Sequence, residues 1–268
     1  MNMEIIKDVS YGTNERHRYD IFFPKKPVSD RGVLLFIHGG GWSSGDKSAH
    51  FADAEYFCKR GYICASMNYR YVAEDISVFD ELDDVTACLL SVTEETSKKG
   101  FNVTDVILSG GSAGAHLAML YAYTRKEKSP LSIVAVCAYC PPVNCYSHDF
   151  LLGISGEFED WKYGILSLCC GLKLTKQNYL DEPQQRALKR ISPSEYISCD
   201  CMPTAVFPAV NDELVPIRHV RDFITKLNEN NVINDIVVYE ISGHALDKDP
   251  EAVQFSKDII ERYLHMYL

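Results

Sequence analysis

A serine, an aspartate and a histidine that could together cleave an acyl bond stand in this order along the chain. Ser112 is the central residue of a G-x-S-x-G pentapeptide, Asp212 lies in PAVNDELVPI, and His244 lies in YEISGHALDKD. A serine hydroxyl is a weak nucleophile at its ordinary pKa, and it needs a base that a third group orients. A histidine and an acid meet this need if the fold brings them to the serine.

The local sequence around Ser112 is typical of a sharp turn between a strand and a helix. The apolar run VTDVILSG precedes it, and residues 113–124 have the composition of a buried helix. A serine on such a turn has an exposed hydroxyl, and the crowded backbone needs small residues at Gly110 and Gly114. A tight turn whose serine only caps the helix would also fit the pentapeptide. The pentapeptide alone therefore leaves both interpretations open.

The other two residues also follow predicted strands. Asp212 comes just after the run 203–210, and His244 comes just after the run 235–241. Open α/β sheets build their sites at the carboxyl ends of parallel strands, so all three side chains are expected at one edge.

Each of the two downstream residues has a plainer interpretation. Asp212 could cap the helix that begins near Pro216, and His244 could be an ordinary loop residue. Glu213 and Asp247 are rival acids, although Asp247 is very near His244 in sequence. The position of three suitable residue types at three strand ends favours the catalytic interpretation.

A second glycine cluster, IHGGGW, directly follows the apolar run Val33–Ile37. Three consecutive glycines could serve a phosphate, a tight turn or an oxyanion. The phosphate motifs G-x-x-x-x-G-K-[ST] and G-x-G-x-x-G are absent. Acyl transfer needs preorganised N–H donors for its oxyanion. One is the N–H that follows the nucleophile, here Ala113, and the second comes from a loop after an earlier strand. The glycine cluster is in the right place for that loop.

Predicted strands and helices alternate along most of the chain, which indicates a largely parallel sheet covered by helices on both faces. The predicted strands cover residues 3–9, 17–23, 33–37, 62–69, 103–110, 132–139, 203–210 and 235–241. The predicted helices cover residues 46–60, 78–97, 113–124, 217–230 and a C-terminal segment from about residue 250. The pattern fails over residues 143–195, which we interpret as a lid insertion within a single domain, residues 1–268.

Composition excludes several other classes. The chain of 268 residues has 27 basic and 37 acidic residues, a net charge of −10, and no basic block. Nucleic acid and anionic membranes are therefore not expected partners. The sequence predicts no signal peptide and no transmembrane segment. The ten cysteines lack zinc-site spacing, and several lie in predicted helices and strands, so we expect a reduced, cytoplasmic protein without disulfides.

Together the motifs resemble the α/β-hydrolase superfamily, specifically the hormone-sensitive-lipase-like esterases and the short bacterial carboxylesterase and feruloyl-esterase-like relatives. The matching stretches are HGGGW at 38–42, NYRY at 68–71, the Gly110–Gly114 pentapeptide with AHLA behind it, NDELVP and SGHAL. The resemblance therefore extends over most of the chain. It implies an α/β-hydrolase fold, with a mostly parallel sheet of about eight strands, flanking helices and a small helical lid.

The same resemblance assigns roles to the catalytic residues. It implies that Ser112 is the nucleophile, His244 the general base and acid, and Asp212 the acid that orients the histidine. It also implies no metal and no organic cofactor.

The oxyanion hole and the pocket follow from the same likeness. The N–H groups of Gly40, Gly41 and Ala113 would form the hole, and we further expect Trp42 and Tyr69 to line the substrate pocket.

Two departures favour the shorter relatives. Gly111 stands where many lipase-like members have an acidic residue or a histidine. About 30 residues precede the strand before the glycine cluster, so we expect no long N-terminal helical cap.

The sequence thus predicts a serine carboxylesterase that hydrolyses small esters with short acyl, acetylated or phenolic groups. The expected partner is a small-molecule ester, and a homodimer remains open. An arylformamidase or a small amidase or peptidase would use the same residues. A non-catalytic binding protein on the same fold is a third alternative, although such proteins lose a member of the triad.

Overall fold

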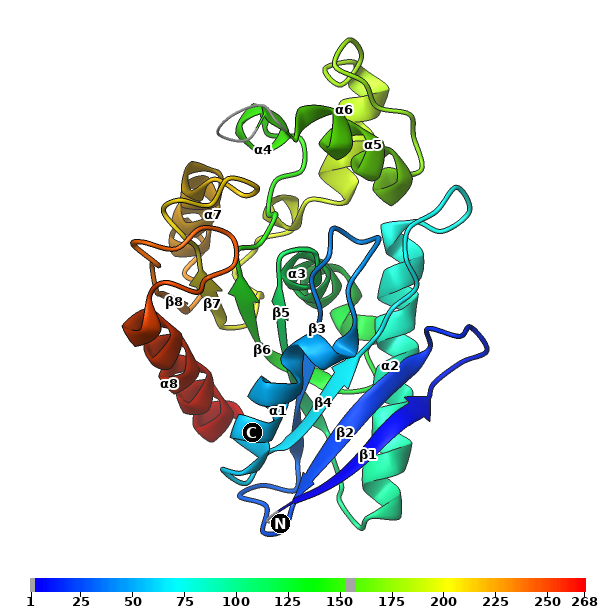
Figure 1. Cartoon of the computed structure of the whole chain (residues 1–268), viewed down its shortest axis with the longest axis vertical. Helices are drawn as coiled ribbons and strands as arrows, with labels where there is room; N and C mark the ends of the chain where they lie inside the picture. Colours follow the sequence, from blue (N-terminus) through cyan, green and yellow to red (C-terminus); the bar gives the residue numbers. More distant parts are fainter. Residues whose placement is uncertain (1–2, 153–157) are drawn as a thin grey trace.

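Eight strands form one sheet in the order β1-β2-β4-β3-β5-β6-β7-β8 (Figure 1). The computed structural model describes residues 3–152 and 158–268. The strands are β1 (Met3–Ser10), β2 (Arg18–Pro24), β3 (Gly32–Ile37), β4 (Ile63–Met67), β5 (Asp105–Gly111), β6 (Ser132–Tyr139), β7 (Thr204–Phe207) and β8 (Asn234–Ile236). β1 and β2 pair antiparallel with their neighbours, and the pairs from β4 to β8 are parallel.

The central strands are mostly apolar and largely buried because both faces of the sheet are covered. All six residues of β3 are buried, and alternate side chains point to opposite faces. Leu35 packs in one hydrophobic cluster with the helices at residues 78–98, 113–125 and 217–229, whereas Phe36 packs in another with the helices at residues 51–58 and 250–267. The sheet therefore separates two cores, one on each face.

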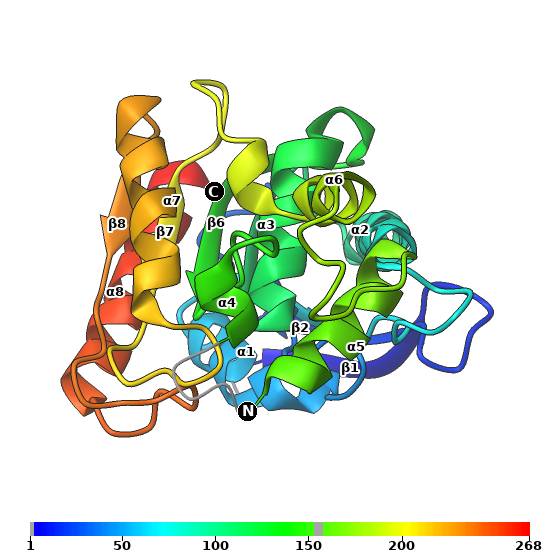
Figure 2. The ribbon, with the colours of Figure 1, turned by 90° about the horizontal axis from the view of Figure 1, so that it is seen from above.

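Helices cover both faces of the sheet (Figures 1 and 2). The covering helices are α1 (Phe51–Cys58), α2 (Val78–Lys98), α3 (Ala113–Arg125), α7 (Ile217–Glu229) and α8 (Pro250–Tyr267). Three more, α4 (His148–Leu152), α5 (Glu159–Cys170) and α6 (Glu182–Arg190), lie between β6 and β7 in sequence. Short 3-10 helices cover Lys47–His50, Lys126–Lys128 and Pro193–Glu195.

The eight expected strands and the covering helices are confirmed, with changes at their ends. The last strand is shorter than predicted and covers Asn234–Ile236, with an isolated bridge between Ala209 and Tyr239 beyond it. The expected helix over 46–60 is a 3-10 turn followed by α1. The irregular stretch 143–195 contains α4, α5 and α6, and its residues 153–157 lie outside the described residues.

The three helices of this insertion stand above the carboxyl ends of the parallel strands (Figure 1). The view from above places them over α3 and the neighbouring loops (Figure 2). The loops that follow β3, β5, β7 and β8 emerge at the same edge, because parallel strands end together there. The carboxyl ends of the parallel strands therefore lie below this region of loops, and the segment with α4, α5 and α6 lies above it.

Candidate active site

Ser112 lies on a sharp turn between β5 and α3. Its backbone has φ 54° and ψ −121°, a region that a non-glycine residue enters only when its surroundings hold it there. Its N–H donates to the carbonyl oxygen of Tyr139, 2.8 Å away, on the neighbouring strand. The strained backbone places the hydroxyl above the edge of the sheet.

The glycines beside Ser112 permit close backbone contacts. A Cβ at Gly114 would lie 2.0 Å from the carbonyl oxygen of Ile37, and one at Gly110 would lie 2.5 Å from the carbonyl carbon of Gly114. No L side chain fits at such distances, so α3 packs against β3 only because both positions are glycine. Gly111, by contrast, has open space where a Cβ would stand.

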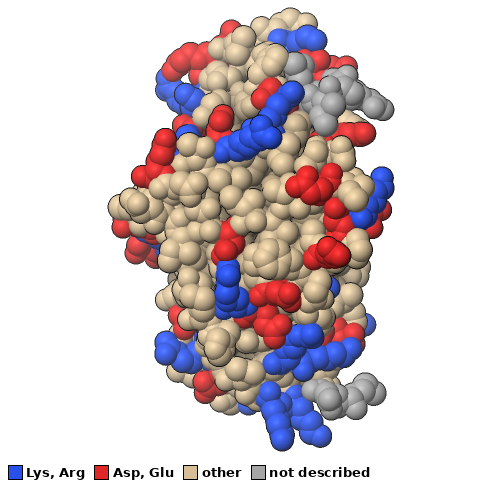
Figure 3. Space-filling view, turned by 90° about the vertical axis from the view of Figure 1, so that its left-hand side faces the viewer, with Lys and Arg blue, Asp and Glu red and all other residues tan. Residues whose placement is uncertain are grey.

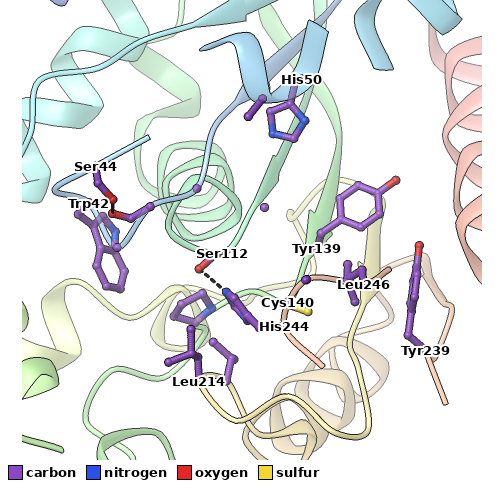
Figure 4. Close-up of a pocket in the computed structure, with 18 of the residues that line it drawn as sticks. Trp42, Ser44, His50, Ser112, Tyr139, Cys140, Leu214, Tyr239, His244 and Leu246 are labelled. Carbon is purple, nitrogen blue, oxygen red and sulfur yellow. Dashed lines mark hydrogen bonds between the residues drawn. The ribbon is translucent and has the colours of Figure 1, made fainter. Parts of the chain in front are cut away.

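The structure brings Ser112, His244 and Asp212 into one hydrogen-bonded relay. Figure 4 shows its bond between Ser112 and His244. His244 Nε2 lies 2.9 Å from Ser112 Oγ, and Nδ1 lies 2.8 Å from Asp212 Oδ2. In the tautomer with the proton on Nδ1, the imidazole donates to the carboxylate and accepts from the serine hydroxyl. This arrangement can take a proton from Ser112 while the carboxylate orients the ring.

Asp212 is held firmly by its own loop. Its carboxylate is fully buried, and Oδ1 accepts from the N–H groups of Leu214 and Val215 at 2.9 and 2.8 Å. The other oxygen is left for His244. The rival acids Glu213 and Asp247 are both exposed.

The loop that carries His244 is fixed by a second aspartate, which sequence reasoning missed. Asp249 accepts from the N–H groups of Ser242 and Ile241 at 2.7 and 3.1 Å. The Ser242 hydroxyl in turn accepts from the Lys248 N–H at 2.9 Å. The sequence signal was weak, because Asp249 reads only as a residue before a helix.

The glycine loop after β3 lines the same pocket as Ser112. Gly40 and Gly41 have φ values of 118° and 57°, which L side chains rarely adopt. A Cβ at Gly40 would lie 2.1 Å from the carbonyl oxygen of Ser44. Among the described residues, the N–H groups of Gly40, Gly41 and Ala113 donate to no protein acceptor. They are therefore available to an oxygen of a bound molecule.

His38 braces this loop from behind. The fully buried imidazole accepts from the Arg16 guanidinium at 3.2 Å and donates to the Gly39 carbonyl oxygen at 2.6 Å. The Tyr69 ring stacks on the imidazole, with 4.3 Å between the ring centres, and the Tyr69 hydroxyl donates to the His38 carbonyl oxygen at 3.0 Å. Burial lowers the pKa of His38 to about 4, so the ring is neutral.

The structure corrects the expectation for Tyr69. This side chain is fully buried against His38 and is not among the residues that line the pocket. Its phenol ring packs in the core and its hydroxyl is used by the loop, so neither reaches a substrate.

Trp42 does line the pocket, and its ring nitrogen is anchored. Nε1 donates to His116 Nδ1 at 3.1 Å, and His116 Nε2 donates to the carbonyl oxygen of Ile191 at 2.6 Å. Burial lowers the pKa of His116 to about 4. The glycine loop, α3 and the segment after α6 are therefore connected through one neutral histidine.

The pocket beside Ser112 has a volume of about 640 Å³. The insertion contributes Phe150, Trp161 and Lys162 to its wall. A polar group formed by His50, Asp53 and Lys257 lies on another part of the wall, with Lys257 paired to Asp53 at 3.2 Å. In the close-up, Trp42 and His50 stand on different sides of Ser112 (Figure 4). No motif announces these wall residues, because only tertiary structure brings them together.

This sheet, the strained serine turn and the Ser-His-Asp relay define the chain as an α/β-hydrolase. A family model for BD-FAE matches residues 19–227, which is most of the chain. The chain therefore belongs to the BD-FAE family. The expected resemblance to the esterases of the α/β-hydrolase superfamily is confirmed at this level.

Individual relatives are more distant. A probable carboxylic ester hydrolase of Mycobacterium tuberculosis, LipM, is 27% identical over 255 residues, covering 90% of this chain and 56% of LipM. A probable isoprenylcysteine alpha-carbonyl methylesterase of Arabidopsis thaliana, ICMEL1, is 23% identical over 250 residues, covering 89% of this chain and 50% of that protein. The chain thus spans about half the length of these curated relatives.

Among solved structures, esterase B from Lactobacillus rhamnosis superposes with a TM-score of 0.78 at 20% identity, over 98% of this chain and 85% of that one. This likeness establishes the fold.

Proposed function

We propose that this protein is a serine carboxylesterase that hydrolyses small esters. The observation that carries the proposal is the relay from Ser112 through His244 to the buried Asp212, at the floor of an open pocket. The relatives named as ester hydrolases support the same reaction class.

In the proposed reaction, Ser112 Oγ attacks the ester carbonyl carbon as its proton passes to His244 Nε2. Asp212 stabilises the imidazolium that forms. The imidazolium then gives its proton to the departing alkoxide, which leaves an acyl-enzyme on Ser112. Water loses a proton to His244 and attacks the acyl carbon. The bond from that carbon to Ser112 Oγ then breaks, the imidazolium returns its proton to Oγ, and the acid is released.

The proposed oxyanion hole consists of the N–H groups of Gly40, Gly41 and Ala113. Preorganised donors of this kind stabilise charge that develops only in the transition state. The positive φ values of the two glycines support the assignment, since L side chains rarely adopt the backbone conformations that this loop requires.

The pocket wall supports a small ester with two unlike ends. We assign the short acyl or phenolic group to the aromatic side, with Trp42 and Trp161, and a hydroxyl-bearing group to the polar side, with His50 and Asp53. The volume of about 640 Å³ is in the range of small-molecule sites.

We further propose that the chain is one α/β-hydrolase domain with a lid at about 143–195. Phe150, Trp161 and Lys162 of this stretch line the pocket, so it covers the substrate.

A small molecule remains the proposed partner, and the cytoplasm the proposed location. Acidic and basic side chains are interspersed over the face that carries α7 and α8 (Figure 3). All ten cysteines are free thiols, seven of them buried, which supports a reducing compartment. In the described residues no helix is long and apolar enough to cross a bilayer.

The test compares hydrolysis of p-nitrophenyl esters of increasing acyl length by the wild type and by Ser112→Ala. We expect turnover of short-chain esters by the wild type and near-background rates for the variant, with Ser198→Ala, an exposed serine, as the matched control. A fluorophosphonate should label Ser112, as mapped by mass spectrometry. Wild-type rates in Ser112→Ala would remove the serine from the mechanism.

Formamides and amides of aromatic amines are assayed in parallel with these esters. Faster turnover of these substrates would favour the arylformamidase or amidase alternative. Absence of turnover and of labelling would favour the binding protein.

A further inference from the structure

Cys140 is the one cysteine among the described residues whose thiol lies at the relay. It directly follows β6, and its backbone has φ 44°, in the left-handed region. Its N–H donates to the carbonyl oxygen of Phe207 at 3.0 Å, which fixes the backbone in that conformation. The side chain is 2% exposed and lines the pocket. Figure 4 shows its sulfur beside His244.

Three different ligand types therefore meet at one point. A sulfur of Cys140, a carboxylate oxygen of Asp212 and a ring nitrogen of His244 all lie within 4.8 Å of one another. Thiolate, imidazole and carboxylate are the ligands that zinc takes in proteins, and three protein ligands with one open position are common. We propose that Cys140, Asp212 and His244 form a binding site for a zinc ion that switches the enzyme off. The inhibitory effect rests on the proposed esterase function, whereas the metal site does not.

The geometry needs only small side-chain shifts. Ligand atoms on a tetrahedral zinc lie roughly 3.3–3.8 Å apart, from metal–ligand bonds of about 2.0–2.3 Å. The separation of 2.8 Å between His244 Nδ1 and Asp212 Oδ2 must widen, and the longest separation within the group, at most 4.8 Å, must shorten. Rotations about the side-chain bonds supply shifts of about 1 Å.

Charge and protons balance at this site. The thiol releases its proton to water on binding, and Asp212 binds as a carboxylate. A thiolate and a carboxylate together neutralise Zn²⁺, which suits a buried position. The imidazole stays neutral, because the proton on Nδ1 moves to Nε2 through solvent and Nδ1 coordinates the metal. One proton leaves for each zinc ion bound.

This change of tautomer explains the inhibition. When Nε2 carries the proton, it has no lone pair for the Ser112 hydroxyl, so the general base is lost. The glycine loop and the pocket wall around Trp42 and His50 contribute no ligand to this zinc ion and stay as they are. Zinc at this site should therefore lower kcat and leave KM nearly unchanged. A metal ion bound on the substrate side, by Ser112 Oγ and Nε2, would instead compete with the ester.

Another thiol pair must be removed before the test. Cys199 is exposed and Cys201 is half-buried, with Asp200 between them, and both could bind zinc at the surface. The experiments therefore use the Cys199→Ser/Cys201→Ser variant as the parent protein.

Steady-state ester hydrolysis by the parent is titrated with buffered Zn²⁺, and then repeated after adding Cys140→Ser. We expect reversible loss of kcat in the parent, recovered with EDTA, and at least tenfold weaker inhibition after the substitution. Equal inhibition with and without Cys140, or inhibition that raises KM only, would overturn the proposal.

Cobalt gives a readout that is independent of catalysis. Co²⁺ added to the parent carrying Ser112→Ala should produce the near-ultraviolet absorption of a thiolate–cobalt bond, which Cys140→Ser abolishes. If Cys140→Ser fails to fold, Asp212→Asn, which removes one anionic ligand, should weaken Co²⁺ binding at least tenfold. Absence of the absorption in the Ser112→Ala protein would overturn the metal site. If the absorption appears but the wild-type protein hydrolyses no ester, the metal site stands and the proposed function alone is rejected.

Discussion

Lys162 Nζ donates a hydrogen bond to the carbonyl oxygen of Leu214, 2.8 Å away, and so joins the insertion to the loop that carries Asp212. The same ammonium donates to the carbonyl oxygen of Phe150, and the residue is 1% exposed. Burial lowers its pKa to about 8. Because the Leu214 N–H donates to Asp212, Lys162 holds the segment that orients the carboxylate.

Replacing Lys162 by methionine should impair the chemical step. The loop around Asp212 loses its tie to the insertion, and misplacement by about 1 Å costs on the order of 10- to 100-fold in rate. We expect kcat for a short-chain ester to fall by this factor, with a smaller change in KM. The matched control is Lys176→Met, an exposed lysine on the same insertion. A wild-type kcat in Lys162→Met would exclude a positioning role.

Asp212→Asn should leave the fold intact and lower kcat by about 10³- to 10⁴-fold, because an amide NH₂ favours the wrong histidine tautomer. The exposed rival acid is tested by Asp247→Asn, which should hydrolyse the same ester at the wild-type rate. If instead Asp247→Asn abolishes activity and Asp212→Asn does not, the acid has been assigned wrongly.

The two glycines flanking Ala113 and Ser112 should respond oppositely to alanine. Gly114→Ala forces a methyl group against the Ile37 carbonyl and should lower the free energy of unfolding by about 3 kcal/mol or more. Gly111→Ala meets open space and should raise it by about 0.5 kcal/mol through the unfolded state. Urea denaturation measures both, and similar losses in the two variants would contradict the close-packing argument.

Acid should destabilise the fold through its buried neutral histidines. Burial lowers the pKa of His38 and His116 to about 4 and that of His219 to about 3, from 6.5 in the unfolded chain. Below pH 6.5 the unfolded chain thus binds more protons, and the free energy of unfolding falls until the folded-state values are reached. Each unit by which the pKa of a histidine differs between the folded and unfolded chain changes the free energy of unfolding by about 1.4 kcal/mol.

The expected signature is a melting temperature that drops steeply between pH 6.5 and 4. His116→Gln keeps an acceptor for Trp42 and a donor for Ile191, so the fold should be retained. Because the substitution removes one of the titrating histidines, the melting temperature should depend less on pH. His265→Gln, an exposed histidine, should reproduce the wild-type profile. Parallel profiles for all three proteins would mean that His116 does not carry the effect.

Much of the fold and of the relay could be predicted because the signals are local. Strand β3 is apolar throughout, and the G-x-S-x-G turn stands between a strand and a helix, where its glycines are required. Asp212 and His244 were located by the strand ends before them. Each inference needed only a few neighbouring residues.

The remainder depends on contacts between distant segments. Lys162 reads as a surface lysine on a helix, yet the loop after β7 and the carbonyl of Phe150 bury it. Tyr69 is an aromatic residue just after a strand, which is typical of a pocket residue. Its position beside His38, however, is set by the packing of β4 on β3. The helices within 143–195 are short, with 5, 12 and 9 residues, and a helical period is hard to recognise over so few residues.

The insertion leaves the sheet after β6 and returns at β7, its direct neighbour in the sheet. This connection means that one continuous segment of the chain supplies part of the pocket wall. One continuous stretch of the chain carries Phe150, Trp161 and Lys162, while Ser112, Asp212 and His244 lie outside it. Exchange of this single segment would therefore remodel the pocket wall and leave the three relay residues in place, provided that the incoming segment again supplies a donor for the Leu214 carbonyl.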